Sequence, residues 1–300
     1  MIDFLLVGTF KAGSTSIAYG MAESRDVFIP AVKDPYYFLK NRLEVFTDPP
    51  DFVAFQRKYA VTSADGFKSL FQQNAKKFQG EATPLYLYLH EYAIPDIKSV
   101  NADAKIIIVL RNPVDRAFSN YSHNKKDGFE NRSFEYVTRN YKVLENQTTH
   151  PFFHYVSSGF YAKQVKAFLD NFKDVLVVRY EDFNLAPDIE INRILHFLGA
   201  TEVIPTPSLR LNKTGKVRSE TVHSFIHQEG QLKSFLRPVY RSIVRSPKLR
   251  LRLSEYVKNK NIETVVLDAE SRLWLQQLYL DDMCQLSDLL SFDFREFWFK

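Results

Sequence analysis

The residues best able to do chemistry stand at the start of the chain, in a short loop of glycine, hydroxyl and lysine side chains. The apolar run at residues 4–7 leads into Gly-Thr-Phe-Lys-Ala-Gly-Ser-Thr-Ser, residues 8–16. An apolar strand that enters such a loop and then a helix can bind a phosphate. The loop N–H groups and the positive end of the helix dipole both point at the anion.

The spacing of this loop is close to that of the kinase-type phosphate loop, G-x-x-x-x-G-K-[ST], with one displacement. Gly8 and Gly13 fit the pattern, but Ser14 follows where lysine is expected. The lysine stands earlier, at Lys11. Because the displaced cation reaches a different atom of a nucleotide, the loop argues against a kinase.

A second polar segment follows the apolar run at residues 105–110, which predicts a strand. Arg111 stands where a magnesium-dependent phosphoryl-transfer enzyme carries a carboxylate. The next residues, Asn-Pro-Val-Asp, predict a helix start, since they supply a cap, a fixed first φ and a favourable charge. Arg111 and Ser119 could converge on a second anion. Two phosphate sites without a metal site suit a nucleotide phosphorylated at both ends of its ribose.

These two segments resemble the nucleotide motifs of the sulfotransferases that use 3′-phosphoadenosine 5′-phosphosulfate (PAPS). The loop with Lys11 is similar to their 5′-phosphosulfate loop. Residues 111–121 are similar to their 3′-phosphate motif, an arginine followed eight residues later by a serine. The resemblance implies PAPS as donor, 3′-phosphoadenosine 5′-phosphate (PAP) as product and no metal. It also implies an α/β fold, the P-loop-like sulfotransferase fold, with a central parallel sheet flanked by helices.

Further segments follow in the order of the family. Residues 32–38 (Val-Lys-Asp-Pro-Tyr-Tyr-Phe) resemble the K-E-P-x-F-F segment of the heparan-sulfate-type branch, whose acidic residue is the catalytic base. Residues 80–86 resemble that branch's E-K-T-P-x-Y segment. Residues 175–182 and 212–218 match a core strand and a glycine-containing loop that closes over the 3′-phosphate. The resemblance covers residues 2 to about 220 and is typical of a bacterial member of the carbohydrate-type branch.

The resemblance assigns roles to the matched residues. Lys11 and Asp34 are the expected catalytic residues, one stabilising the departing phosphate and the other accepting the proton of the acceptor hydroxyl. The expected contacts of the 5′-phosphosulfate are Lys11, Ala12, Gly13, Ser14, Thr15 and Ser16. Those of the 3′-phosphate are Arg111, Ser119, Lys213, Gly215, Lys216 and Arg218.

The base has two rivals. Asp34 stands where glutamate is usual, and Glu81 could be the base instead, or a structural partner of a lysine. Sulfotransferases for small molecules use a histidine, which makes His123 the second rival. Ala82 replaces a lysine that lies near the sulfuryl group in the heparan-sulfate enzymes. These departures do not affect the expected use of PAPS as donor, but they leave the identity of the acceptor open.

The expected acceptor is a hydroxyl of a carbohydrate, on a glycan or a glycolipid. A small or carrier-bound alcohol or phenol is the alternative within the family. Outside it stand a metal-dependent P-loop kinase and a non-catalytic relative that binds a nucleotide or a glycan. The displaced lysine argues against the first, and the survival of both phosphate motifs argues against the second.

Length and composition fit an ordinary globular enzyme. The 300 residues are 45% hydrophobic, enough for a large core. We expect one domain over residues 1–300, with a donor-binding core over 1–220 and a helical part over 221–300. Insertions are expected at about 41–75 and 123–160. Cys284 is the only cysteine and permits no internal disulfide, which favours a reducing compartment. With Met1 as the native start, we expect a cytoplasmic protein.

A basic segment over residues 231–260 stands apart from the rest of the chain. It holds nine lysines and arginines and one glutamate, whereas the whole chain has a formal net charge of +5. Such asymmetry is typical of contact with an anionic acceptor or with the acidic inner face of a membrane. A solvated helix face is equally consistent with it. Nucleic acid is not expected, because no recognised motif accompanies the charge. The oligomeric state is not readable from the sequence.

Overall fold

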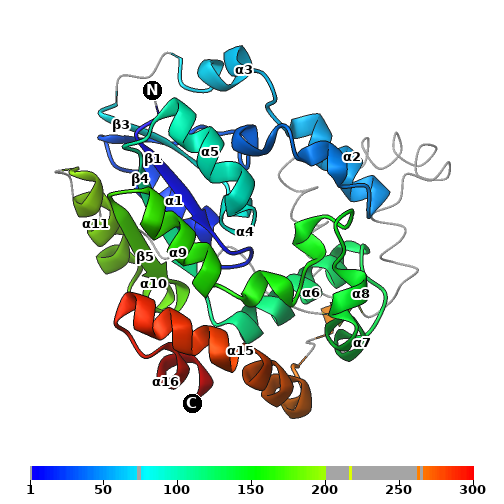
Figure 1. Cartoon of the computed structure of the whole chain (residues 1–300). Coiled ribbons are helices and arrows are strands. Elements are labelled where there is room, and N and C mark those ends of the chain that lie inside the picture. The colour runs from blue at the N-terminus through cyan, green and yellow to red at the C-terminus, as the bar shows by residue number, and fades with distance from the viewer. Residues whose placement is uncertain (1, 73–75, 201–215, 218–261, 264–265) are drawn as a thin grey trace, which may run out of the picture.

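A computed structural model describes residues 2–72, 76–200, 216–217, 262–263 and 266–300 of the chain. Five parallel strands form its central sheet in the order β2-β3-β1-β4-β5 (Figure 1). The strands are β1 (Phe4–Gly8), β2 (Val27–Phe28), β3 (Phe78–Ala82), β4 (Lys105–Leu110) and β5 (Val175–Arg179). The predicted α/β fold with a parallel sheet between helices is confirmed.

Strand β1 lies at the centre of the sheet and is buried along its whole length. Leu5 and Val7 pack into one hydrophobic cluster, and Phe4 and Leu6 pack into another on the opposite face. This alternation follows from the two-residue period of a strand. Because β1 pairs in parallel with both β3 and β4, their carboxyl ends meet at one edge, where ligands bind in such sheets.

Helices cover both faces of the sheet. On one face lie α1 (Ser14–Ala22), α10 (Tyr180–Leu185) and α11 (Pro187–Leu198). On the other face lie α4 (Leu85–Tyr88), α5 (His90–Val100), α6 (Pro113–Asp127), α9 (Ala162–Asn171), α15 (Ala269–Leu290) and α16 (Phe294–Phe299). Both faces are therefore withdrawn from water, as parallel sheets require.

The apolar runs of the sequence mark four of the five strands, and β3 is the one they miss. Its residues, Phe-Gln-Gly-Glu-Ala, are not a hydrophobic run, so their pattern did not indicate a buried strand. Gly80 is needed in this strand because a Cβ there would lie 2.5 Å from the ring of Phe4 on the neighbouring strand. Tertiary contact, and not local propensity, accounts for this strand.

The two expected insertions hold short helices, and α2 (Pro50–Tyr59) of the first lies on the same side of the molecule as α7 (Phe134–Arg139) and α8 (Tyr141–Leu144) of the second, whereas α3 (Ala64–Ser69) lies near the N-terminus (Figure 1). The first also holds η1 (Tyr37–Leu39) and η2 (Leu43–Val45). The second also holds η3 (Pro151–Phe153) and η4 (Ser157–Gly159). Backbone hydrogen bonds join the two: Thr47 N–H donates to Thr148 (2.9 Å), and His150 N–H donates to Asp48 (2.8 Å).

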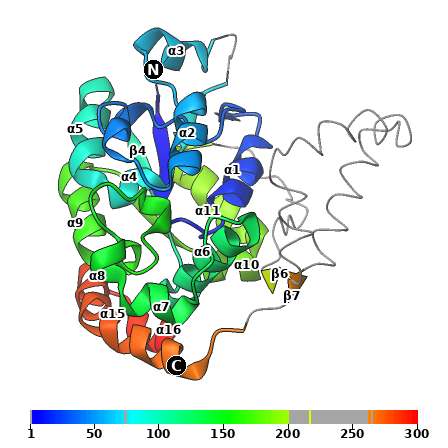
Figure 2. The same ribbon diagram turned by 90° about the vertical axis from the view of Figure 1, so that its right-hand side faces the viewer.

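A two-stranded antiparallel ladder, β6 (Lys216–Val217) with β7 (Ile262–Glu263), lies beside the main body (Figure 2). Strand β6 packs against α6, the helix that follows Arg111. The basic segment over residues 231–260 lies outside the described residues. Within the described part, no helix has both the length and the apolar character that crossing a bilayer requires.

Candidate active site

The glycine loop that follows β1 approaches the neighbouring strand too closely for side chains. A Cβ on Gly8 would lie 2.4 Å from the carbonyl oxygen of Val109 on β4. Lys11 (φ 65°) and Gly13 (φ 81°) both adopt the left-handed region. At Gly13 a Cβ would also lie 2.9 Å from the ring of Tyr180. The chain thus turns sharply around Lys11 and enters α1 at the edge of the sheet.

The first turn of α1 is open to an anion. Gly13 is its N-cap and supplies no side chain, and the first turn holds no acidic residue. The amide N–H groups at such a helix start lack intrahelical partners and carry the positive end of the dipole. All the predicted contacts of the 5′-phosphosulfate fall in this loop and turn.

Burial and neighbouring cations both disfavour the charged form of Lys11. The pKa of its ammonium group is lowered to about 8, first by burial and then by the charges of Arg111 and Lys33. Lys11 is therefore still mostly charged at pH 7. A group of cations held this close without full neutralisation favours a bound anion.

The side chain of Arg111, which directly follows β4, binds the backbone of the glycine loop. Its Nη1 donates a hydrogen bond to the carbonyl oxygen of Lys11 (2.7 Å), and its guanidinium lies over the ring of Tyr180 at 4.6 Å from the centroid. Tyr161 Oη donates to the Arg111 carbonyl (2.9 Å). Arg111, a predicted ligand of the 3′-phosphate, thus positions the backbone of Lys11, a predicted ligand of the 5′-phosphosulfate.

The helix start predicted after Arg111 is confirmed. Helix α6 begins at Pro113, and Asn112 Oδ1 accepts from the amides of Val114 (3.0 Å) and Asp115 (3.3 Å). Ser119 lies on α6 and is largely buried. Strand order therefore brings Arg111 and the glycine loop together at one edge of the sheet, and Ser119 follows two turns into the helix that begins there.

Asp34 lies in a segment with unusual backbone geometry. Of the four non-glycine residues with positive φ in the described part of the chain, three are Lys11, Asp34 (φ 50°) and Tyr36 (φ 56°). Such conformations cost about 1–3 kcal/mol each and cluster at functional sites. Asp34 Oδ2 lies 3.6 Å from Lys33 Nζ, and its side chain is 23% exposed. Its Oδ1 is buried and accepts no hydrogen bond from the described residues. Burial raises the pKa of this carboxyl to about 6, against the opposing effect of Lys33.

Glu81 is in a different environment. It lies on β3 with 1% of its surface exposed, and its Oε2 accepts a hydrogen bond from Thr83 Oγ1 (2.7 Å). Burial, together with a smaller effect of the nearby charge of Asp34, raises its pKa to about 8, against the opposing hydrogen bonds of Tyr86 and Thr83. At pH 7 the Glu81 side chain is mainly a neutral acid. Its recorded partners are Thr83 and Tyr86, and not a lysine.

His123 lies on α6, one turn beyond Ser119. Its Nε2 is 3.5 Å from Asp127 Oδ2, and its ring meets Phe152 edge to face at 5.7 Å. Burial lowers its pKa to about 4, and the charge of Lys11 adds to this effect. The imidazole is therefore neutral at pH 7 and faces the same cations as the loop.

Three predicted ligands of the 3′-phosphate, Lys213, Gly215 and Arg218, lie outside the described residues. Lys216 is described only as part of β6. Among the residues that the structure describes, no three or more His, Cys, Asp or Glu side chains gather in a way that could hold a metal ion.

The sequence reasoning missed Tyr180 and Asp127. Tyr180 directly follows β5, and the end of that strand lies beside Arg111, so strand order could have indicated it. Asp127 is one turn beyond His123, and its charge raises the pKa values of both His123 and Lys11. The sequence shows the i,i+4 spacing of His123 and Asp127, but it does not show that the charge of Asp127 also acts on Lys11.

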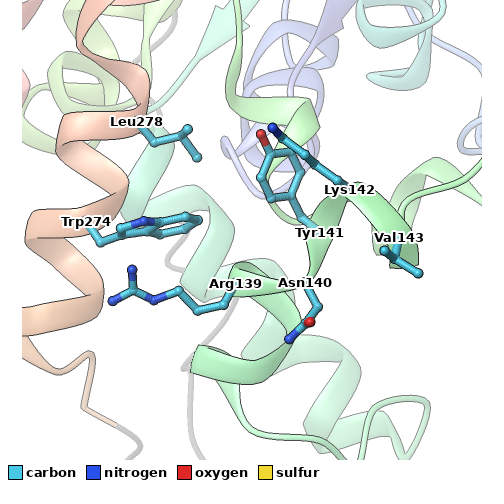
Figure 3. A pocket seen from close by; sticks show the side chains of 7 residues that line it. All are labelled: Arg139, Asn140, Tyr141, Lys142, Val143, Trp274 and Leu278. Carbon is cyan, nitrogen blue, oxygen red and sulfur yellow. The ribbon is translucent and has the colours of Figure 1, made fainter.

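A separate hollow of about 340 Å³ lies between α15 and the α7–α8 segment (Figure 3). It is lined by Arg139, Asn140, Tyr141, Lys142, Val143, Trp274 and Leu278. The Arg139 guanidinium lies over the Trp274 ring, 4.6 Å from its centroid. None of the candidate donor or base residues lines this hollow.

Comparison with known families decides the family. Residues 2–231 match the model of the sulfotransferase domain. The chain belongs to the sulfotransferase family. This match spans both phosphate motifs and the predicted base segment.

Individual relatives agree at lower similarity. Human heparan sulfate glucosamine 3-O-sulfotransferase 3B1 is 30% identical over 139 residues, 45% of this chain and 34% of its own length. The bovine bifunctional heparan sulfate N-deacetylase/N-sulfotransferase 2 is 24% identical over 307 residues, 96% of this chain and 29% of its own length. The chain thus spans about a third of the length of these relatives.

A solved structure matches the whole fold. The sulfotransferase from Alicyclobacillus acidocaldarius superposes with a TM-score of 0.75 over 100% of this chain and 99% of the other, at 24% identity. At this identity the likeness establishes the sulfotransferase fold.

Proposed function

We propose that this chain transfers the sulfuryl group of PAPS to an acceptor hydroxyl by in-line displacement, with PAP as product and without a metal. One observation carries the proposal. Lys11 adopts the left-handed conformation in a loop to which Arg111 donates a hydrogen bond, and it lies at the uncapped start of α1. It is within electrostatic range of Lys33, whose ammonium group lies 3.6 Å from the carboxylate of Asp34.

The residues present fit the donor. The open first turn of α1 and Lys11 suit the 5′-phosphosulfate, and Arg111 and Ser119 suit the 3′-phosphate. When bound, PAPS supplies a sulfuryl group activated on its 5′-phosphate. Lys11 would stabilise the negative charge that develops on the phosphate oxygen as the sulfuryl group departs. Arg111 and Ser119 would orient the nucleotide and take no part in bond breaking.

Asp34 is the base that the geometry favours. Its buried Oδ1, like Oε1 of Glu81, accepts no hydrogen bond from the described residues, but the pKa of Asp34, about 6, leaves Asp34 ionised at neutral pH. The acceptor O–H bond would break toward this oxygen as the acceptor oxygen bonds to sulfur. A base is most effective when its pKa lies near the working pH. Glu81 is neutral at that pH, and His123, with a pKa of about 4, is a weaker base.

A sugar hydroxyl is the acceptor we propose. Support comes from the 30% identity to a heparan sulfate 3-O-sulfotransferase over 45% of this chain. A small or carrier-bound alcohol or phenol is the alternative that the same chemistry would serve.

Transfer of label from radiolabelled PAPS to a panel of saccharides, alcohols and phenols tests the proposal. We expect labelled product without added metal and in the presence of a chelator. Binding of PAP with no transfer to any acceptor would favour a non-catalytic relative. Transfer of phosphate from Mg·ATP instead would make the chain a kinase and contradict the proposal.

A further inference from the structure

Four phenylalanine rings form a chain of ring contacts that starts in the glycine loop of the proposed site of transfer. We call Phe10, Phe52, Phe129 and Phe152 the aromatic wall. Phe10 meets Phe152 edge to face at 4.9 Å between centroids, and Phe152 stacks on Phe52 at 5.3 Å. Phe52 in turn meets Phe129 at 5.6 Å. None of the four is fully buried, and Phe129 is 39% exposed.

The wall begins at the reacting groups. Phe10 directly precedes Lys11 in the glycine loop, and Phe152 touches the ring of His123. The charges of Lys11 and Lys33 lower the pKa of His123, so these three groups lie within electrostatic range of one another. From there the wall leads outward to the exposed ring of Phe129. An acceptor that reaches the sulfur between Lys11 and Asp34 would pass along it.

The wall is held in place from several directions. Its rings come from the glycine loop, α2, the segment after α6, and η3. The backbone hydrogen bonds between the two insertions, such as His150 N–H to Asp48 (2.8 Å), fix α2 against η3. Buried His150 packs against Phe52 at 4.9 Å. Such a surface is pre-formed and needs little ordering on binding.

The groups around the wall are polar and charged. Lys33, which pairs with Asp34, is within electrostatic range of His123, and Asp127 lies beside His123. A site with aromatic faces and a few placed polar groups suits a ligand that has both kinds of surface. A pyranose ring has an apolar C–H face and a rim of hydroxyl groups, whereas a flat phenol would leave most of these polar groups without partners.

We propose that the aromatic wall is the acceptor subsite and that it stacks against the apolar face of a sugar ring, which directs one hydroxyl toward Asp34. This inference rests on the proposed function and names the substrate class of the same site. It assigns recognition of the acceptor to Phe129 and Phe152, which take no part in donor binding.

The test compares Phe129→Ala with Phe55→Ala. Phe55 is on α2, one turn from Phe52, is 62% exposed, and its ring pairs with Tyr59 at 4.8 Å. The probes are radiolabelled PAPS with lactose and methyl β-glucopyranoside as saccharides, and with 2-naphthol as a phenol. We expect Phe129→Ala to raise the saccharide KM about fivefold with kcat retained, because one stacked ring is lost. Phe55→Ala should match the unchanged protein, and Phe129→Tyr should restore the KM.

Phe152→Leu is the second variant, since it keeps the apolar volume but removes the stacking ring. It should also raise the saccharide KM and leave the PAP dissociation constant within about twofold, because Phe152 meets the donor loop through the ring of Phe10 and leucine retains an apolar contact there. Unchanged saccharide KM in both variants would overturn the assignment of the wall. Sulfation of 2-naphthol but of neither saccharide would overturn the substrate class.

Failure of the proposed function has a different signature. If no probe is sulfated, or if PAP does not bind, sulfuryl transfer itself is contradicted. Normal transfer with no effect of the wall variants contradicts only this inference.

Discussion

The donor half and the acceptor half of the candidate site are built in different ways. The donor half comes from the carboxyl ends of β1 and β4 and the first turns of the helices that follow them. Lysine and arginine cations dominate it. The acceptor half is the aromatic wall, whose rings come from residues 10, 52, 129 and 152. One half is electrostatic and comes from two short motifs, each local in sequence, and the other is apolar and comes from single residues of four segments.

This difference separates two functions. Phosphate recognition needs backbone N–H groups at fixed spacing, so few sequences provide it. Acceptor recognition needs only a surface of the right shape and polarity, so insertions can change it while the donor half stays the same. Substitutions should therefore separate cleanly into those that alter turnover or PAP binding and those that alter acceptor KM.

The largest effect is expected at Lys11. Lys11→Ala should lower kcat by about 10²–10³, because it removes a cation placed where negative charge develops. Steady-state transfer from PAPS measures this. Lys40→Ala is a matched control, since Lys40 pairs with Asp96 (2.8 Å) away from the loop. A near-normal kcat of Lys11→Ala would contradict the role proposed for Lys11 in the donor half.

Asp34→Asn should lower kcat by about 10²–10⁴, the range of a positioned general base, while PAP binding is retained. In the unchanged protein, kcat/KM should rise with pH through about 6, because Asp34 acts in its ionised form and its pKa is about 6. The pH profile of Asp34→Asn should lack this rise. Full activity in Asp34→Asn together with loss in His123→Ala would move the base to His123.

Arg111→Lys should weaken PAP binding by about tenfold or more, since charge-assisted hydrogen bonds contribute about 1.5–3 kcal/mol and lysine cannot reproduce the guanidinium geometry. A moderate loss of kcat should accompany it, because Arg111 also holds the Lys11 carbonyl (2.7 Å). Calorimetric titration with PAP and with 5′-AMP distinguishes the two effects. An unchanged ratio of the two affinities would show that Arg111 does not contact the 3′-phosphate.

Glu81→Gln should have the smallest effect on activity, because glutamine resembles the neutral acid already present at pH 7. Its effect is expected on stability. The folded pKa of Glu81 is raised from 4.5 to about 8, so its stabilising contribution is present below about pH 4.5 and is lost as pH rises toward and through 8. Thermal unfolding should therefore show a gain for Glu81→Gln at pH 8 and little gain at pH 4. Abolished transfer in Glu81→Gln would instead make Glu81 the base.

The strands and the helix start of the proposed donor half could be predicted from the sequence, and most of the proposed acceptor half could not. The glycine loop, the strand before Arg111 and the cap at Asn112 are short-range patterns, and the fold reproduces them. Strand β3 lacks an apolar pattern, and its central residue is Gly80 because the ring of Phe4 leaves no room for a side chain there. The stacking of Phe52 on Phe152 joins residues 100 positions apart, which no periodicity reveals. The contrast between Asp34 and Glu81 depends on burial, which their spacing does not disclose.

The most direct test of the central claim is calorimetric titration with PAP in the absence of metal, with 5′-AMP and Mg·ATP as controls. The two phosphate sites that we propose at one edge of the sheet predict tight binding of PAP that a chelator does not change and that collapses for 5′-AMP. A preference for Mg·ATP, or equal affinity for PAP and 5′-AMP, would contradict the account of the donor half.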